Sequence, residues 1–375
     1  MKIQPSLLFA PFAALTLLVS GCGKPATPPA AESTPASPAA DASPASSAGA
    51  AQTDPEKRLN IFCWSEYVPQ DVIDAFSKET GIKVYVENYA SNEEMLAKLF
   101  AGGGNYDLIQ PSEYVIEALI KANALRPIDH ALLPNLKNID PKFLNMPFDP
   151  GNKFTVPWMA GSVGIVVNTE KITDPINGYT DVFQEKFKGR IVTLDDAREL
   201  VSWGFNVLKI PTNDVTDENL QKVKPLLAGW IPLIKVFDSD SPKTALINGD
   251  VDLGIVWNGE GAILYNTDKK FKWVIPAEGT HLFVDSLAIP KGSTHPLNAQ
   301  LFMNFIMRPE INKMVADAFP YLNPNAAGRA LMSAEQLANP ASFPTDADMA
   351  RMEIFNDIGD KASNVDELVT SLKVQ

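Results

Sequence analysis

Residues 59–122 read LNIFCWSEYVPQDVIDAFSKETGIKVYVENYASNEEMLAKLFAGGGNYDLIQPSEYVIEALIKA. The stretch begins with an apolar run that ends at Trp64 and is typical of a buried strand. A helix signal follows from Pro69, and Gly81 is a suitable stop for that helix. Residues 82–89 then alternate between apolar and polar side chains, which predicts a second strand.

The same order repeats in the second half of this stretch. Ser91 and Glu94 have the spacing of a capping box and predict the start of a helix. Residues 107–110 predict a short buried strand, and another helix runs to about Ala122. Strands that alternate with helices in this way predict an α/β fold with a parallel sheet and right-handed crossovers.

The rest of the chain continues the α/β pattern and is long enough for two lobes. Strands are predicted at 190–194, 251–257, 272–276 and 285–289, and helices from Asp196, from Glu260, at 296–307 and at 346–357. We expect a first lobe of residues 55–163 with 285–330 and a second lobe of residues 164–284 with 331–375. The candidate crossings between them are 164–168 and 286–289.

The N-terminus predicts export. Lys2 precedes an uncharged apolar run that is too short to span a membrane and fits a signal peptide. Small residues precede Cys22, so residues 1–22 are expected to be a lipoprotein signal with a lipidated cysteine. An ordinary signal peptide with a chance cysteine is the alternative. Residues 23–54, rich in Ala, Pro and Ser, predict a disordered tether, with a mucin-like or cleaved segment as the alternative.

Composition narrows the class of partner. The formal net charge of -13 argues against nucleic acid and against adhesion to anionic lipid, so membrane contact is expected through the lipid anchor only. The same charge is compatible with a cationic ligand. Apart from Cys22 the chain holds one cysteine, Cys63, whose apolar surroundings predict a buried packing role. Cysteine spacings typical of metal sites are absent from the sequence, and no cofactor is predicted.

Candidate ligand-binding residues follow the predicted strands, because open α/β sheets bind ligands beyond the carboxyl ends of their strands. The residues there are aromatic or acidic, with small hydroxyl side chains among them: Trp64, Ser65, Glu66, Tyr67, Ser112, Glu113, Tyr114, Asp195, Asp196, Glu199, Trp257 and Asp285. Carboxylates bind ammonium groups through charge-assisted hydrogen bonds, and aromatic faces cover methylene chains and attract cations. The collection therefore favours a small polyamine.

Each of these residues also has a purely structural interpretation. Asp196 and Glu199 have the spacing of a helix cap, and Trp64 and Trp257 are the kind of residue that fills a core. Glu66 and Glu113 could be solvated loop charges. Asp285 is harder to explain structurally, because a carboxylate inside an apolar strand is costly unless it is paired.

Seven motifs carry a resemblance to a known family: CWSEYVPQDVIDAFSKETGIKV, SNEEMLAKL, YDLIQPSEYV, PFDPGNKFTVPW, TLDDARE, GIVWNGE and DSLAIP. The chain resembles the spermidine/putrescine-binding periplasmic proteins of polyamine ABC importers. The resemblance implies a type II periplasmic-binding-protein fold, in which two lobes joined by hinge strands close on the ligand. It also implies a periplasmic location and an ABC importer permease in the inner membrane as the partner.

The resemblance assigns roles residue by residue. It implies that the first lobe contributes Trp64, Ser65, Tyr67, Ser112 and Tyr114. It implies that Asp196 and Glu199 bind ammonium groups toward one end of the ligand. Asp285 is implied to bind a terminal ammonium at the other end. It further implies stacking by Trp257 and Tyr321 and a minor polar contact from Ser239. Glu66 and Phe283 complete the set of candidates. Glu113 replaces a neutral residue of the family and is expected near the rim.

Two departures bear on which polyamine is bound. Phe283 stands where the spermidine-preferring form has tryptophan, and putrescine-preferring relatives resemble this sequence there. Phe355 aligns with a polar glutamine in the last helical region of that form. Against these, residues 195–199 match the spermidine-preferring form, so spermidine and putrescine both stay open.

Other functions remain as alternatives. The histidines His130, His281 and His295 are scattered in the sequence, and no catalytic motif accompanies them, so an enzyme is not expected. An amino-acid binder would need an arginine for the carboxylate, and Arg198 is expected to act as a helix salt-bridge partner instead. A binding protein for a different cationic solute, or a polyamine sensor that reports to a membrane signalling partner, fits the same residues.

Overall fold

The computed structural model describes residues 52–102 and 104–374. The predicted signal peptide, its Cys22 and the predicted tether up to residue 51 lie outside the described residues. Asp54, the last residue of the predicted tether, is buried, and its N–H donates to Asn298 Oδ1 at 3.1 Å. The N–H of Asn298 donates in return to Asp54 Oδ2 at 2.8 Å, so Asp54 is part of the folded body.

The first α/β run folds as its sequence predicts. Its elements are β1 (Arg58–Trp64), α1 (Gln70–Thr80), β2 (Lys83–Tyr89), α2 (Asn92–Phe100), β3 (Leu108–Ile109) and α3 (Glu113–Lys121). Strand β1 pairs in parallel with both β2 and β3, which confirms the predicted parallel arrangement. Gly81 ends α1 with a φ of 71°, a left-handed conformation that glycine adopts without the steric cost of a Cβ atom. Cys63 is buried in β1, as predicted.

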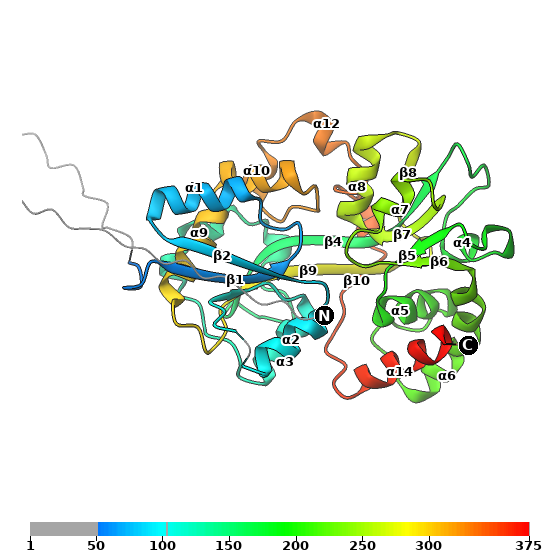
Figure 1. The fold of residues 1–375 in the computed structure, drawn as a ribbon, viewed down its shortest axis with the longest axis horizontal. Coiled ribbons are helices and arrows are strands. Elements are labelled where there is room, and N and C mark those ends of the chain that lie inside the picture. The colour runs from blue at the N-terminus through cyan, green and yellow to red at the C-terminus, as the bar shows by residue number, and fades with distance from the viewer. Residues whose placement is uncertain (1–51, 103, 375) are drawn as a thin grey trace, which may run out of the picture. The chain divides into compact units, whose positions relative to one another are not determined.

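Two long strands, β4 (Thr155–Asn168) and β9 (Thr280–Ala288), pair with each other in the antiparallel sense and run between the two groups of elements in Figure 1. Residues Thr155–Ser162 of β4 pair with β9. From Val163 onward β4 pairs with β7 (Leu253–Trp257), and from Ile165 also with β8 (Phe271–Val274). The exchange of partners lies upstream of the segment 164–168 that the sequence suggested as a crossing. All of β4 is buried on both sides of the exchange, so the change of partner is not accompanied by a change in burial along the strand.

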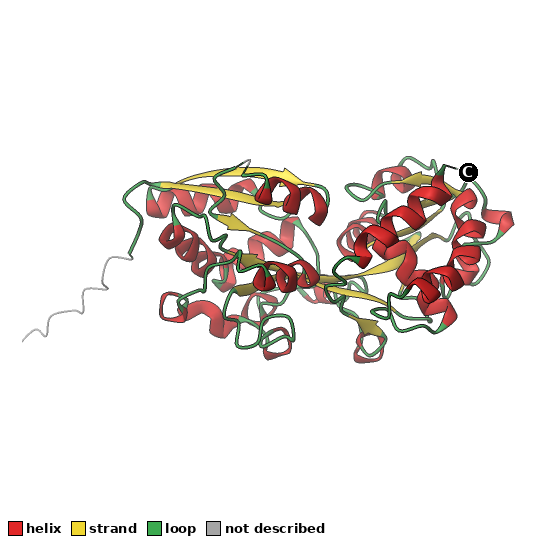
Figure 2. Cartoon of the chain, turned by 90° about the horizontal axis from the view of Figure 1, so that it is seen from below, coloured by secondary structure: helices red, strands yellow, loops and turns green. Residues whose placement is uncertain are grey.

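A second α/β unit lies beyond this exchange. It contains β5 (Ile191–Thr193), α5 (Ala197–Leu208), α6 (Asp217–Trp230), β6 (Ile234–Phe237), α8 (Asn258–Thr267) and the C-terminal α14 (Lys361–Lys373). Strand β5 pairs in parallel with β6 and β7. The order of the paired strands is therefore β2-β1-β3-β9-β4-β7-β5-β6, with helices packed around them in Figure 2.

Shorter elements complete the described chain. They are α4 (Tyr179–Val182), α7 (Lys243–Ile247), α9 (Pro296–Ile306), α10 (Pro309–Ala318), α11 (Ala326–Arg329), α12 (Ala334–Leu337), α13 (Asp346–Met349), β10 (Met352–Glu353) and 3-10 turns at His130–Leu132, Pro134–Asn138, Pro141–Phe143, Glu185–Phe187 and Ile231–Leu233. The helix predicted at 346–357 is wrong beyond Met349, because the chain extends there and pairs with β9. Within 52–102 and 104–374, no helix is both long and apolar enough to cross a membrane.

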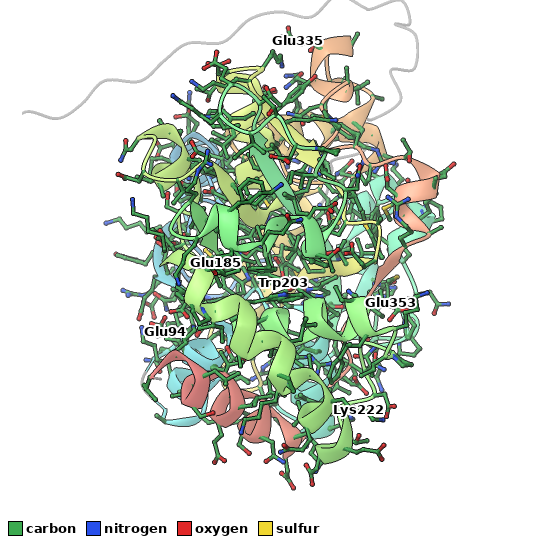
Figure 3. All side chains as sticks on the ribbon, turned by 90° about the vertical axis from the view of Figure 1, so that its right-hand side faces the viewer. Glu94, Glu185, Trp203, Lys222, Glu335 and Glu353 are labelled. Atoms are coloured by element: carbon green, nitrogen blue, oxygen red, sulfur yellow. The ribbon has the colours of Figure 1, made fainter. Side chains whose placement is uncertain are left out.

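Separate apolar cores stabilise the two α/β units. Around β1 the core includes Phe76, Phe302 and Phe305, and the rings of Phe76 and Phe302 meet edge to face with centroids 5.0 Å apart. Around β5 it includes Trp203, which is labelled in Figure 3 and stacks on Tyr179 with ring centroids 5.6 Å apart. These cores hold the strand ends that carry the polar side chains described next.

Candidate functional site

A cavity of about 320 Å³ lies at the carboxyl ends of β1, β5, β6 and β7. Of the candidate residues, Glu113 does not line the cavity, and these residues do: Trp64, Ser65, Glu66, Tyr67, Ser112, Tyr114, Asp195, Asp196, Glu199, Ser239, Trp257, Phe283, Asp285 and Tyr321. These residues come from distant parts of the sequence. Strand β1 and the parallel set of β5, β6 and β7 run in opposite directions on the two sides of β9 and β4, and the carboxyl ends of both line the same cavity. Phe283 and Asp285 lie within β9.

Strand β9 supplies three of the lining side chains at alternate positions. His281, Phe283 and Asp285 lie two positions apart, with one residue between neighbours, so they project from the same face of the strand into the cavity. The sequence prediction began this strand only at Asp285. It therefore missed that His281 shares a face with two candidate ligand contacts.

Asp285 is a buried carboxylate held by neutral donors. Ser112 Oγ donates to Asp285 Oδ1 at 2.6 Å, and Tyr67 Oη donates to Oδ2 at 2.7 Å. The residue is 2% exposed, and no lysine, arginine or histidine of the described residues forms an ion pair with it. Burial raises the pKa of Asp285 to about 7, although the two hydroxyl hydrogen bonds act to lower it. Its negative charge is therefore stabilised by dipoles but not balanced by a neighbouring cation.

Asp196 forms a second acidic region at the start of α5. Its side chain caps the helix, accepting from the Glu199 N–H at 3.0 Å, as the spacing predicted. Burial, together with the charges of Glu199 and Glu93, raises the pKa of Asp196 to about 7. Glu93 from α2 and Asp366 from α14 also line the cavity, and each acts to raise the pKa of a neighbouring carboxyl.

Glu199 does not complete the capping box. Its Oε1 lies 2.6 Å from His281 Nδ1, and its Oε2 accepts from Trp203 Nε1 at 3.1 Å. The other ring nitrogen of His281, Nε2, lies 2.8 Å from Glu113 Oε1. Glu113, Glu199 and His281 are 0%, 1% and 4% exposed, so the three side chains form a buried acid–imidazole–acid array.

This array corrects the expectation that Glu113 lies at the rim. Its Oε2 accepts from the Val284 N–H at 3.0 Å, and its Oε1 also accepts from the Phe355 N–H at 3.3 Å. The Phe355 ring stacks on the imidazole of His281 with centroids 3.6 Å apart. Phe355 follows β10 in a segment without regular secondary structure, not in a helix as expected.

Aromatic side chains cover the remaining wall. The rings of Trp257 and Phe283 meet edge to face at 5.5 Å, and the rings of Tyr67 and Tyr321 are 5.0 Å apart. Trp257 Nε1 donates to the carbonyl oxygen of Ser239 at 3.0 Å, which fixes the indole. Trp64 Nε1 is buried without a partner among the described residues and faces the same space. Such walls can cover a methylene chain.

Glycines allow these rings to approach the backbone. A Cβ atom at Gly161 would lie 2.3 Å from Phe283 Cζ. At Gly259 it would lie 2.4 Å from Tyr321 Cε2. Neither position leaves room for a larger residue while the ring keeps its place.

At the rim, contacts join β1 to the segment after β6. Ser65 Oγ donates to Asp240 Oδ1 at 2.5 Å. Glu66 pairs with Lys243 at 3.1 Å, and Lys243 also pairs with the buried Glu260 at 2.7 Å. Glu66 has a φ of 55°, an uncommon conformation for a residue with a side chain. The turn after β1 is thus held across the opening of the cavity.

Sequence reasoning missed several lining residues. Arg198 lines the cavity with its guanidinium 4.7 Å above the Phe355 ring, and it donates to Thr212 O and Asn213 Oδ1 instead of forming the expected helix salt bridge. Helix α14 contributes Asp366, Val369, Thr370 and Lys373. No local pattern marks these residues, because α14 reaches the cavity only by packing against α5 and α6.

Comparisons with known proteins show what the chain as a whole is similar to. A family model described as a bacterial extracellular solute-binding protein matches residues 71–345. The spermidine/putrescine-binding periplasmic protein of Salmonella typhimurium is 35% identical over 327 residues, which cover 86% of this chain and 94% of the relative. A putrescine-binding periplasmic protein of Escherichia coli is 33% identical over 309 residues, or 77% of this chain and 84% of the relative. A solved spermidine/putrescine ABC transporter substrate-binding protein from Streptococcus pneumoniae superposes with a TM-score of 0.74 at 30% identity, covering 84% of this chain and 98% of that one.

Proposed function

The chain belongs to the bacterial extracellular solute-binding protein family, and we propose that its cavity captures a small polyamine, putrescine or spermidine. The matches confirm the predicted family and its two-lobed α/β fold. The family is one of binding proteins, and the residues of the cavity are accordingly interpreted as ligand contacts and not as a catalytic apparatus.

The observation that carries the proposal is Asp285. A carboxylate that is 2% exposed and hydrogen-bonded only by the hydroxyls of Ser112 and Tyr67 is costly to keep ionised. A ligand ammonium group supplies the missing positive charge. The second acidic region around Asp196 offers the same interaction to the other end of a linear ligand, and the aromatic wall formed by Trp257, Phe283 and Tyr321 covers its methylene groups.

Titration calorimetry with putrescine, spermidine, spermine and glutamate tests this function. Binding of at least one polyamine with a Kd well below millimolar is expected, and glutamate is expected not to bind. Glutamate is included because Arg198 Nη1 is buried without a partner among the described residues and could receive a carboxylate. Tight glutamate binding without polyamine binding would refute the proposal.

We further propose that the two lobes, residues 55–163 with 285–330 and residues 164–284 with 331–375, close on the ligand by a hinge motion. The closed form then docks on the permease of an ABC importer, the kind of system named for the Streptococcus pneumoniae relative. Polyamine uptake by cells that lack this chain should fall and recover when it is restored. Normal uptake in its absence would argue instead for a sensor role.

We also propose that Cys22 is lipidated and tethers the periplasmic body to a membrane through the segment between Cys22 and Asp54. The small residues before Cys22 and the composition of the following segment support the proposal. Replacing Cys22 by Ala should move the protein from the membrane fraction to the soluble fraction. An unchanged distribution between the two fractions would show that Cys22 does not anchor the protein to a membrane.

A further inference from the structure

The imidazole of His281 lies between two buried glutamates that come from different parts of the fold. Glu113 belongs to α3, Glu199 belongs to α5, and His281 itself belongs to β9. The nitrogen–oxygen distances are 2.8 Å on the Glu113 side and 2.6 Å on the Glu199 side, short enough for both ring nitrogens to donate. Donation by both nitrogens requires the protonated ring.

The electrostatic surroundings keep the ring protonated at neutral pH. Burial acts to lower the pKa of His281, but the charges of Glu199 and Glu113, with their hydrogen bonds, outweigh it and raise the pKa to about 10. The same imidazolium acts to lower the pKa of both Asp196 and Asp285. His281 is therefore close enough to interact with both acidic regions of the cavity.

Resting on the polyamine-binding function proposed above, we propose that His281 is the specificity-determining residue of the cavity: its imidazolium takes up the charge of Glu199 and makes the cavity select a linear diammonium ligand over a triamine. The two terminal ammonium groups bind at Asp285 and at Asp196. The middle of the ligand has to be an uncharged methylene chain.

The hydrogen bonds of Glu199 explain why an internal ammonium is not accommodated. Both of its carboxylate oxygens already interact with protein groups, one with the imidazolium and the other with the Trp203 indole. An internal ammonium near this wall would lose its hydration without gaining a free carboxylate, and it would meet a cation that is already in place.

A pair of ligands tests the proposal on the wild-type protein. Spermidine and 1,8-diaminooctane have the same number of chain atoms between their terminal nitrogens, but only spermidine carries an internal ammonium. Calorimetric titration should give a Kd for 1,8-diaminooctane at least about tenfold lower than the Kd for spermidine. Spermidine binding as tight as 1,8-diaminooctane would overturn the role of His281 and leave the polyamine function standing. If neither of these ligands nor putrescine binds, the proposed function itself fails.

A variant tests the residue directly. His281→Gln keeps a polar side chain whose amide N–H group can donate to one of the two glutamates, but it removes the positive charge. Its ratio of spermidine Kd to 1,8-diaminooctane Kd should be about tenfold lower than that of the wild type.

The matched control is His295→Gln. His295 is also a buried histidine with a carboxylate near each ring nitrogen, Asp107 at 3.0 Å and Glu56 at 3.3 Å, but it does not line this cavity. Its replacement should leave the ratio unchanged. An unchanged ratio in His281→Gln, or an equal change in both variants, would overturn the proposal. If His281→Gln does not fold, the comparison of ligands on the wild type still decides the question.

Discussion

Two buried carboxylates of the same cavity, Glu199 and Asp285, differ in the groups that bind their oxygens. The oxygens of Glu199 face an indole N–H and an imidazolium that it shares with Glu113, so both oxygens have partners within the protein and one of these partners is a cation. Among the described residues, the oxygens of Asp285 accept from the hydroxyls of Ser112 and Tyr67 and form no ion pair. Both residues are almost inaccessible to water, and burial alone does not distinguish them.

The difference separates a structural acid from a functional one. A buried charge whose partner belongs to the protein contributes to the folded state, because removal of either partner leaves the other charge buried and uncompensated. A buried charge without a protein cation costs stability until a ligand supplies the cation. The hydrogen-bonding partner, and not the residue type, therefore tells which acid is available to the ligand.

Replacing Glu199 by Gln should give the largest loss of stability. The change removes one member of the buried array and should lower the free energy of unfolding by about 3 kcal/mol, the lower end of the cost of breaking a buried pair. Denaturant unfolding of the ligand-free protein near neutral pH measures the loss. Because the pKa of His281 is raised in the folded protein, the array stabilises the fold fully at pH values below the pKa of histidine in the unfolded chain. This stabilisation is lost as pH rises through about 10. The difference from wild type should shrink in that direction.

The control for this change is Glu218→Gln on α6. Glu218 is exposed and pairs with Lys222, which is labelled in Figure 3, so its replacement should alter stability little. Equal losses in the two variants would show that the Glu199 array does not stabilise the fold, and the contrast with Asp285 would disappear.

Replacing Asp285 by Asn should weaken ligand binding and have a smaller effect on the stability of the ligand-free protein. The affinity for putrescine should fall by about 2 kcal/mol, or roughly thirtyfold, because a terminal ammonium loses its charge-assisted hydrogen bond. The stability of the ligand-free protein should change less than in Glu199→Gln, because an uncompensated charge is removed. Calorimetry and denaturant unfolding of the two variants measure this crossed pattern. Unchanged affinity would remove Asp285 from the ligand site.

The sequence predicted the parts of the site that follow from local patterns. Residues 59–122 show clear strand and helix periods, and the carboxyl ends of those strands do lie at the cavity. Asp285 was identified because a carboxylate in an apolar strand needs an explanation. Whether any lining residue contacts a ligand remains a prediction from sequence and geometry together.

The array of Glu113, His281 and Glu199 could not be predicted in the same way, because its members are joined only by tertiary contacts. His281 was one of three histidines without a recognisable motif, and Glu113 looked like a loop charge. A strand prediction extended back to Thr280 would have placed His281 on the face of Phe283 and Asp285. The partners of His281 would still have required the packing of α3 and α5 against β9, which no local pattern encodes.

The pH dependence of putrescine binding is a further test of the difference between Asp285 and Glu199, with a smaller expected effect. Burial raises the pKa of Asp285 and of Asp196 to about 7, so both side chains take up protons in the empty cavity as pH falls through neutrality. The ligand binds the ionised forms, while its own ammonium groups stay charged. Lowering the pH from about 8 to about 6 should therefore weaken putrescine binding by about tenfold for each carboxylate that must ionise.

Calorimetry at several pH values measures this slope, and repeating it in buffers of different ionisation enthalpy measures the protons released on binding. Asp285→Asn should retain only the part of the slope that belongs to Asp196. Glu199→Gln tests whether Glu199 contributes to this pH dependence. If His281 interacts with Glu199 throughout this pH range, the variant should keep the change of putrescine affinity with pH that is due to Asp285. A flat affinity between these pH values would mean that Asp285 and Asp196 are already ionised in the empty cavity. Glu199 and Asp285 would then differ in their hydrogen-bonding partners but not in the energy needed to ionise Asp285.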